Sequence, residues 1–178
     1  MEDVPALMNL RNLVIASLPH PDMYVREPSE AAFVSAHIGA AKGAGEGETI
    51  GVFDGDRLAA YGMLGLPSRH DPDNLGRLLG YGGSRLARVA HLASCMVALP
   101  YRGRHLQCSL LAARMQLAYA RGREVCIAMV SPRNQASRSN LIREGLRSDW
   151  KGEIDGLQRE LMAVDLTKRF GACPSGQG

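Results

Sequence analysis

Hydrophobic residues recur with helical spacing near the start of the chain. Residues 6–18 place their large apolar side chains on one stripe, which predicts an amphipathic helix. The stripe consists of Leu7, Leu10, Leu13, Val14 and Leu18. Pro19 ends this helix, because proline cannot continue one. A short helix over residues 28–37, opened by a proline, and a flexible glycine- and alanine-rich loop over residues 39–47 are predicted next.

A β-hairpin follows this loop. Apolar residues over 49–53 lead into Asp54-Gly55, a dipeptide typical of tight hairpin turns, and residues 58–66 form the predicted return strand. Residues 67–84 are rich in glycine and proline and predict a long loop. Connections of this length are often functional rather than mere spacers.

The second half of the chain alternates predicted strands and helices. Strands are predicted over residues 86–99, 125–130 and 157–166, and helices over residues 104–120 and 132–145. The buried face of the first of these helices is predicted to be Leu106, Leu110, Leu111, Met115 and Ala118, with Gly122 as its cap. Strand–helix–strand order indicates an α/β protein. We expect one domain over residues 1–166 and a flexible tail over residues 167–178.

Composition places the chain among ordinary globular proteins and changes this picture little. The 178 residues are 46% hydrophobic and 22% charged. No apolar run approaches the roughly 18 residues of a membrane span, and the acidic start at residues 1–3 leads into no signal-like apolar segment, so no membrane partner is expected. Four cysteines without a CxxC pair, three of them in apolar segments, predict reduced thiols and a cytoplasmic location.

The charged residues narrow the class of ligand only slightly. A net charge of +3 and 5% aromatic residues argue against a nucleic-acid partner. Of 21 basic residues only Lys42, Lys151 and Lys168 are lysines, which leaves 18 arginines. Guanidinium groups suit phosphate recognition, although codon bias explains the same excess. The histidines at 20, 37 and 70 have no metal-ligand spacing, so we expect no metal.

Residues 97–107 carry the most chemical information. A predicted strand ends there, a short basic turn follows, and a helix begins at once. This arrangement directs unpaired backbone N–H groups and the positive end of the helix at one point, where an anion fits, a pyrophosphate best of all. An ordinary strand-to-helix turn with solvated arginines is the alternative.

The same segment carries a family resemblance. Val97, the run Tyr101-Arg102-Gly103-Arg104 and the leucines Leu110-Leu111 resemble the acetyl-CoA motif of the GCN5-related N-acetyltransferases (GNAT). Downstream, Ser131-Pro132-x-Asn134 and Glu144-Gly145-Leu146 are similar to further GNAT patterns. The resemblance covers about residues 86–147, and more loosely the whole chain.

The resemblance implies a three-layer α/β/α acyl-CoA N-acyltransferase fold, with a mixed central sheet and helices on both faces. It implies an enzyme that transfers the acetyl group of acetyl-CoA, the acyl-donor substrate, to a primary amine of a small molecule or peptide. The amine attacks directly in a ternary complex, with the thioester carbonyl held by backbone N–H groups near Ala98 and Leu99. The implied cofactor-binding residues are Val97, Ala98, Leu99, Arg102, Gly103, Arg104, His105, Leu106, Gln107 and Asn134.

Three departures from the family pattern matter. His105 and Gln107 replace two glycines of the motif, so we expect helical backbone at His105 with its side chain turned aside. Leu141 stands where the family often has a tyrosine that acts as the general acid and protonates the departing thiolate. These two departures motivate an alternative, a catalytically silent relative that binds CoA or a partner protein. The usual first strand is also missing or very short, which makes the hairpin strand a sheet edge. Pairing of that edge with a second copy, giving a homodimer, and a wrongly assigned chain start are two explanations.

Two further side chains have alternative roles. His91 lies on the same face of an ideal strand as Val97 and is the candidate general base, because relatives place a glutamate or histidine there and an imidazole suits proton transfer. A core histidine held by one backbone partner is the alternative, and a bulge in the strand would change the direction in which it faces. Asn134 resembles the family asparagine near the pantetheine arm, and it also suits the helix cap. Both roles are compatible. We expect Cys95 and Cys108 to serve packing.

Overall fold

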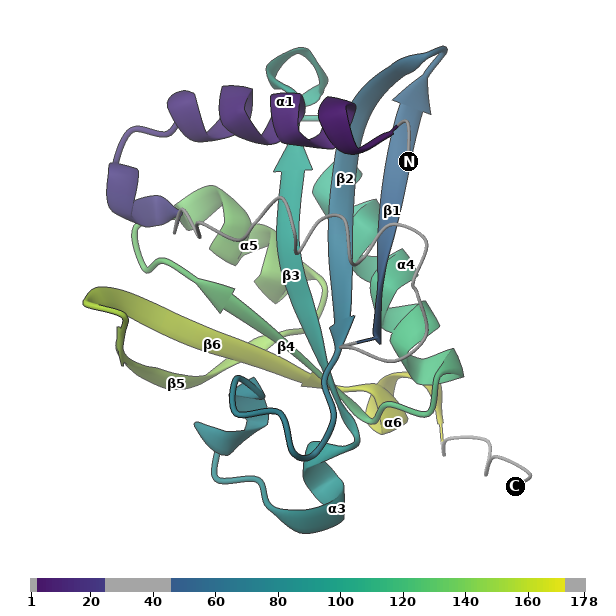
Figure 1. The fold of residues 1–178 in the computed structure, drawn as a ribbon, viewed down its shortest axis with the longest axis vertical. Helices are drawn as coiled ribbons and strands as arrows, with labels where there is room; N and C mark the ends of the chain where they lie inside the picture. Colours follow the sequence, from purple (N-terminus) through teal and green to yellow (C-terminus); the bar gives the residue numbers. More distant parts are fainter. Residues whose placement is uncertain (1–2, 25–45, 172–178) are drawn as a thin grey trace.

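In the described part of the chain, six strands form one sheet with helices on both of its faces (Figure 1). The structure is a computed structural model and describes residues 3–24 and 46–171. The helices are α1 (Asp3–Ala16), α3 (Gly83–Leu86), α4 (Leu106–Ala120), α5 (Gln135–Arg143) and α6 (Leu166–Phe170). Short 3-10 turns are η1 (Pro21–Met23), η2 (Leu75–Arg77) and η3 (Leu99–Tyr101). The strands are β1 (Glu46–Asp54), β2 (Arg57–Leu66), β3 (Val89–Val97), β4 (Val125–Val130), β5 (Arg147–Ile154) and β6 (Leu157–Asp165).

The strand order is β1-β2-β3-β4-β6-β5, and the sheet is mixed. Among these described strands, β3 and β4 pair in parallel and the other neighbouring pairs are antiparallel. In the described part of the chain β1 has one neighbour, β2, and forms an edge of the sheet, as the sequence predicts.

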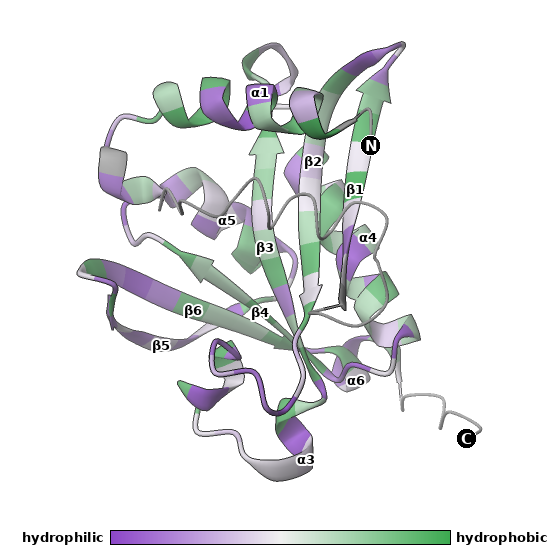
Figure 2. Ribbon diagram, in the orientation of Figure 1, coloured by the Kyte–Doolittle hydropathy of each residue, from purple (hydrophilic) through white to green (hydrophobic). Residues whose placement is uncertain are grey.

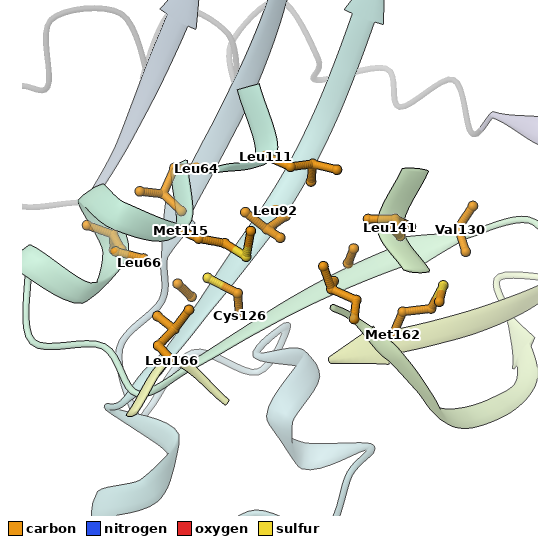
Figure 3. Close-up of a cluster of buried hydrophobic side chains, with 14 residues drawn as sticks. Leu64, Leu66, Leu92, Leu111, Met115, Cys126, Val130, Leu141, Met162 and Leu166 are labelled. Atoms are coloured by element: carbon orange, nitrogen blue, oxygen red, sulfur yellow. The ribbon is translucent and has the colours of Figure 1, made fainter. Parts of the chain in front are cut away.

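Alternating side chains bury both faces of the central strands, and this explains why helices cover the sheet on two sides. Leu7, Leu10 and Val14 of α1 pack with Tyr61 and Met63 of β2. A second cluster of buried side chains lies on the opposite face of the sheet, where α4 and α5 cover the strands (Figure 3). Its main members are Leu64, Leu92, Leu111, Met115, Cys126, Leu141 and Met162. The apolar segments lie along β2, β3 and β4 in Figure 2. The predicted three-layer α/β/α architecture with a mixed sheet is therefore confirmed.

The two parallel strands separate soon after they meet. They pair only through Val89, Ala90 and His91 of β3 with Val125, Cys126 and Ile127 of β4. Beyond these pairs β3 continues beside β2 and β4 beside β6, and the two strands diverge in Figure 1. A sheet whose central strands diverge leaves backbone groups of both strands without a neighbour on that side.

A β-bulge interrupts β3 at Ser94. Gly62 of β2 pairs with Cys95 and Met63 pairs with Ala93, so Ser94 has no partner in the register. The extra residue reverses the alternation of side chains along the rest of the strand. His91 and Val97 therefore do not share the face that an ideal strand would give them.

Several sequence-based boundaries need correction. The strand predicted from residue 86 begins at Val89, because residues 83–86 form α3. The predicted tail is wrong for residues 167–170, which belong to α6, capped by the Asp165 carboxylate at the amides of Thr167 and Lys168. Leu13 is 58% exposed, and Arg11 takes a buried place on α1 instead. The helix predicted over residues 28–37 and most of the loop predicted over 39–47 lie outside the described residues.

The strand β5 was missed entirely. Its residues are mostly polar and only alternate ones are partly buried, because among the described strands β5 lies at the edge of the sheet and pairs with β6 alone. The dipeptide Asp155-Gly156 between the two strands has positive φ at both residues, the geometry of a tight hairpin turn. This is the same signal that predicts the first hairpin at Asp54-Gly55.

Candidate functional site

The turn between β3 and α4 presents a row of unpaired backbone donors. Within the described residues, the N–H groups of residues 103–108 donate to no acceptor. Gly103 supports the turn with φ +80°, a conformation that glycine adopts without strain. Nothing lies within 4 Å of the position that a Cβ atom would take there, so the space above the turn is open. Exposed amides at a helix N-terminus attract anions, since the helix dipole adds positive potential.

His105 caps this helix in a left-handed conformation, with φ 58° and ψ 17°. The expectation of helical backbone at this residue is therefore wrong. The side chain is nevertheless turned aside, because Nδ1 lies 2.9 Å from Nη1 of Arg143 on α5. The imidazole thus leaves the amides of the turn uncovered. Since a left-handed residue is the position that favours glycine, the structure explains why a small residue suits this turn.

Side chains of Tyr101 and Arg102 fasten the turn to the β1–β2 hairpin and to the end of α1. The Tyr101 hydroxyl donates a hydrogen bond to Oδ2 of Asp54, 2.8 Å away in the β1–β2 hairpin. This bond raises the pKa of the Tyr101 phenol. The guanidinium groups of Arg57 and Arg104 lie 5.8 Å and 5.2 Å from the centroid of the same ring. Arg102 donates through Nη2 to the Ser17 hydroxyl, so the turn also contacts the end of α1.

Gln107, the second residue that replaces a glycine, joins α4 to α5. Its Nε2 donates to the Ser137 hydroxyl at 3.0 Å, and its Oε1 accepts from Nδ2 of Asn140 at 2.8 Å. The Asn134 side chain accepts from the backbone N–H of Ser137 at 3.1 Å and caps α5. The capping role expected for Asn134 is thus present in the structure. Gln107 and Asn134 both meet α5 at Ser137, which brings these two predicted site residues together.

The end of β3 offers the remaining predicted contacts. The N–H of Ala98 donates to the carbonyl of Ala59 at 2.9 Å, so it is engaged within the protein. In the described part of the chain the N–H of Leu99 has no acceptor, and the Leu99 side chain is 50% exposed. Val97 and Leu106 are half-buried and pack against the cluster that includes Met96, Ala98 and Tyr101. Of the two amides expected to hold a thioester carbonyl, only that of Leu99 is available.

His91 is distant from this turn along β3 and has a backbone partner. Its Nε2 accepts a hydrogen bond of 3.1 Å from the N–H of Leu75 in η2. Burial lowers the pKa of His91 from 6.5 to about 4. A neutral imidazole has one accepting nitrogen, and here that nitrogen is occupied. The geometry is that of a structural histidine, and His91 can accept a proton only where the amide of Leu75 moves away.

Leu141 and the cysteines belong to the interior. Leu141 is 3% exposed and packs in the core beside α4, so its position serves packing. Burial raises the pKa of the Cys95 and Cys108 thiols, and that of Cys126 to about 12. Such thiols are poor nucleophiles, because the thiolate is the reactive form. In the described ranges, no group of three or more His, Cys, Asp or Glu side chains gathers as metal ligands do.

A pair of hydroxyl groups lies at the bulge, and the sequence patterns do not predict it. The Tyr24 hydroxyl, just after η1, is hydrogen-bonded to Oγ of Ser94, on the α1 side of the sheet. Arg11 lies over the Tyr24 ring at 5.3 Å. No local pattern marks Ser94, because a bulge arises from the pairing of two strands. None of the helices in the described ranges combines the length and apolar character that a bilayer-spanning helix needs.

The fold of this chain is similar to that of several solved structures. A GCN5-related N-acetyltransferase from Kribbella flavida has a TM-score of 0.67 at 17% identity, with 92% of each chain covered. The chain has the GNAT fold. The GNAT fold also relates it to yncA from Salmonella typhimurium, solved with its cofactor acetyl-CoA, at TM-score 0.64, 16% identity and coverage of 93% of this chain and 89% of that one.

A third GNAT-fold structure is the acetyltransferase from Salmonella typhimurium that modifies the N-terminal serine of ribosomal protein L7/L12. Its TM-score is 0.64 at 16% identity, with 92% of this chain and 90% of that chain covered. No family model matches the chain, and no curated protein sequence matches it.

Proposed function

We propose that this protein is an N-acetyltransferase that transfers the acetyl group of acetyl-CoA to a primary amine of a small molecule or peptide. The observation that carries the proposal is the row of unpaired N–H groups at residues 103–108, at the end of the strand that diverges from β4. Solved structures with a similar fold, one of them solved with acetyl-CoA, support the same conclusion.

The residues of the turn fit a CoA pyrophosphate. Their amides carry no other hydrogen bond in the described part of the chain, and Arg102 and Arg104 add positive charge beside them. Backbone donors hold a phosphate without a side chain that must be ordered, which lowers the cost of binding. We assign Val97, Leu99 and Leu106 to the apolar wall along the rest of the donor, and Asn134 and Gln107 to the α5 side.

Catalysis in this proposal rests on placement. The amine nitrogen forms a bond to the thioester carbon, the C–S bond breaks, and the amine loses a proton as the thiolate gains one. The free N–H of Leu99 is the candidate donor to the carbonyl oxygen as charge develops there. Holding the amine and thioester together in one complex removes the entropy of a bimolecular encounter.

One comparison supports a peptide as the acceptor. An acetyltransferase whose structure is similar to this chain modifies the N-terminal serine of a ribosomal protein. An N-terminal amine and a small-molecule amine present the same nucleophile, so both stay within the proposal.

The free thiols Cys95, Cys108 and Cys126 support a reducing, cytoplasmic compartment. The β1 edge of the sheet is where a second copy would pair to form a homodimer.

Binding and turnover test the proposal in two steps. Acetyl-CoA at millimolar concentration should raise the melting temperature, because a ligand that binds only the folded state stabilises it. Amines, including short peptides with free N-termini, are then screened for release of free thiol. Absence of any thermal shift with acetyl-CoA would contradict the proposal at its first step.

Two observations favour a second candidate, a catalytically silent protein that binds CoA or a partner protein. Leu141, which is buried in the core, occupies the position where the family often has a tyrosine as general acid. The accepting nitrogen of His91 is engaged by the amide of Leu75. A tight CoA complex that releases no thiol with any amine of the screen would support this candidate.

A further inference from the structure

Arg114 of α4 is a cation with no exposed surface. Its side chain is 0% exposed, and in the described part of the chain no carboxylate pairs with it. Burial lowers the pKa of its guanidinium, and Nη2 has no hydrogen-bond partner. A buried ion without a counterion is costly, and an apolar side chain of similar volume would often serve stability as well or better. Stability alone therefore does not account for an arginine at this position.

The contacts of Arg114 converge on the bulge in β3. Nη1 donates to the carbonyl of Ala93 at 2.8 Å and to the carbonyl of Met63 at 2.9 Å. Met63 and Ala93 are register partners at the point where the pairing shifts past Ser94. Nε donates to the carbonyl of Leu110 at 3.0 Å, which ties the guanidinium to its own helix. One side chain thus holds both strands at the bulge from the α4 side.

Gly62 provides the space for this arrangement. A Cβ atom at Gly62 would lie 2.8 Å from both Cζ and Nε of Arg114, closer than unbonded atoms pack. Gly62 is also the residue of β2 that pairs with Cys95, immediately beyond the bulge. The guanidinium of Arg114 therefore occupies the space that a side chain at residue 62 would need. A methyl group at residue 62 displaces the guanidinium although Arg114 itself is unchanged.

We propose that Arg114 is a positioning residue for the acyl-donor site. By fixing the carbonyls of Met63 and Ala93 it maintains the bulge, and the bulge directs the last residues of β3 away from β4. This inference rests on the proposed function, because the part of the site that it shapes is the one assigned to the pantetheine arm and thioester. The pyrophosphate turn at residues 103–108 lies beyond the end of β3 and has its own contacts.

The test compares two ligands on the full chain. Acetyl-CoA uses both the turn and the divergent strands, whereas adenosine 3′-phosphate 5′-diphosphate, the nucleotide half of CoA, keeps the pyrophosphate and lacks the arm. We expect Arg114→Met and Gly62→Ala to weaken acetyl-CoA binding about tenfold or more relative to the nucleotide half, measured by calorimetry. Arg114→Lys, which retains a donor to the carbonyls, should recover part of the loss.

Met115→Ala is the matched control. Met115 is the next residue of α4, is equally buried, and packs in the core without contact to the bulge carbonyls. Its truncation should lower the melting temperature and leave the ratio of the two affinities unchanged. Where Arg114→Met does not fold, Gly62→Ala decides the question.

The outcomes separate the inference from the proposed function. A selective loss for acetyl-CoA in the Arg114 and Gly62 variants supports the inference. An equal loss for both ligands, no loss, or the same selective loss in Met115→Ala overturns it. Failure of the unaltered protein to bind acetyl-CoA overturns the proposed function, and the inference with it.

Discussion

His91 accepts a hydrogen bond from the backbone N–H of Leu75 through Nε2, at 3.1 Å. This bond connects the third strand, in the middle of the sheet, to the long connection that follows β2. It defines the tautomer of the ring, because the accepting nitrogen must be unprotonated and the proton of the neutral ring is then on Nδ1. A proton on Nε2 would break the bond and place a charge in the interior.

The stability of the protein should therefore fall in acid through His91. The unfolded chain binds this proton near pH 6.5, whereas the folded protein resists it until about pH 4. Between these values the unfolded state holds more protons, so stability decreases as the pH falls, by roughly 3 kcal/mol in total. Chemical denaturation at several pH values measures the slope. His91→Gln, whose amide oxygen can still accept from Leu75, should flatten the curve between pH 6.5 and 4, and the exposed His70→Gln should not.

The same variant tests whether His91 is a base. With an acceptor from the screen, we expect His91→Gln to keep kcat within about threefold of the unaltered enzyme and to keep its pH–rate profile, because the imidazole nitrogen is already engaged. A drop of about a hundredfold or more, with loss of an acidic limb in the profile, would restore His91 as the general base.

His105 gives a prediction about the turn. A non-glycine residue in the left-handed region costs about 1 kcal/mol, so His105→Gly should recover part of this strain while losing the contact with Arg143. Removal of the imidazole also opens the space beside the amides, and we expect acetyl-CoA to bind more tightly. Asp155→Gly is the control, since Asp155 has φ 51° in the turn between β5 and β6 and is not one of the candidate site residues. Weaker acetyl-CoA binding in His105→Gly would instead assign the imidazole to the phosphate.

Glu160 on β6 gives a prediction about stability alone. Its carboxylate is fully buried and accepts from Nε of Arg138 at 2.7 Å and from Nη2 at 3.3 Å. This pairing lowers the pKa of Glu160, so its contribution is present above the ordinary carboxyl pKa and is lost as the pH falls below it. Glu160→Gln leaves Arg138 without its counterion and should cost about 3 kcal/mol at neutral pH.

A surface pair provides the comparison for Glu160. Arg88 and Glu124 are 3.8 Å apart and both largely solvated, so Glu124→Gln should cost under about 1 kcal/mol. Equal losses for the two variants, measured by denaturation at pH 7, would show that burial does not strengthen the Arg138–Glu160 pair.

Local sequence patterns were sufficient to predict a helix where apolar residues recur on its buried face. The stripe on α4 was predicted because Leu110, Leu111, Met115 and Ala118 recur with helical spacing, and four of its five expected members are buried. The same spacing marks Arg114, which lies four residues after Leu110 and four before Ala118. Its burial could have been predicted from that spacing, although its charge suggests a solvated residue.

Strand β5 shows the opposite case. Its one partner and half-solvated face leave a mostly polar sequence, and only the turn at Asp155-Gly156 marked it. Edge strands are defined by what lies beside them, which a single segment does not contain.

The sequence by itself determined the order of the main helices and strands, the basic strand–turn–helix segment and the resemblance to a fold, because each depends on neighbouring residues. Only the tertiary structure decided that β3 bulges at Ser94, that His91 is bonded to Leu75 and that Arg114 is buried against two strands. These features depend on pairs of segments far apart along the chain, whose register is set by the packing of the whole sheet.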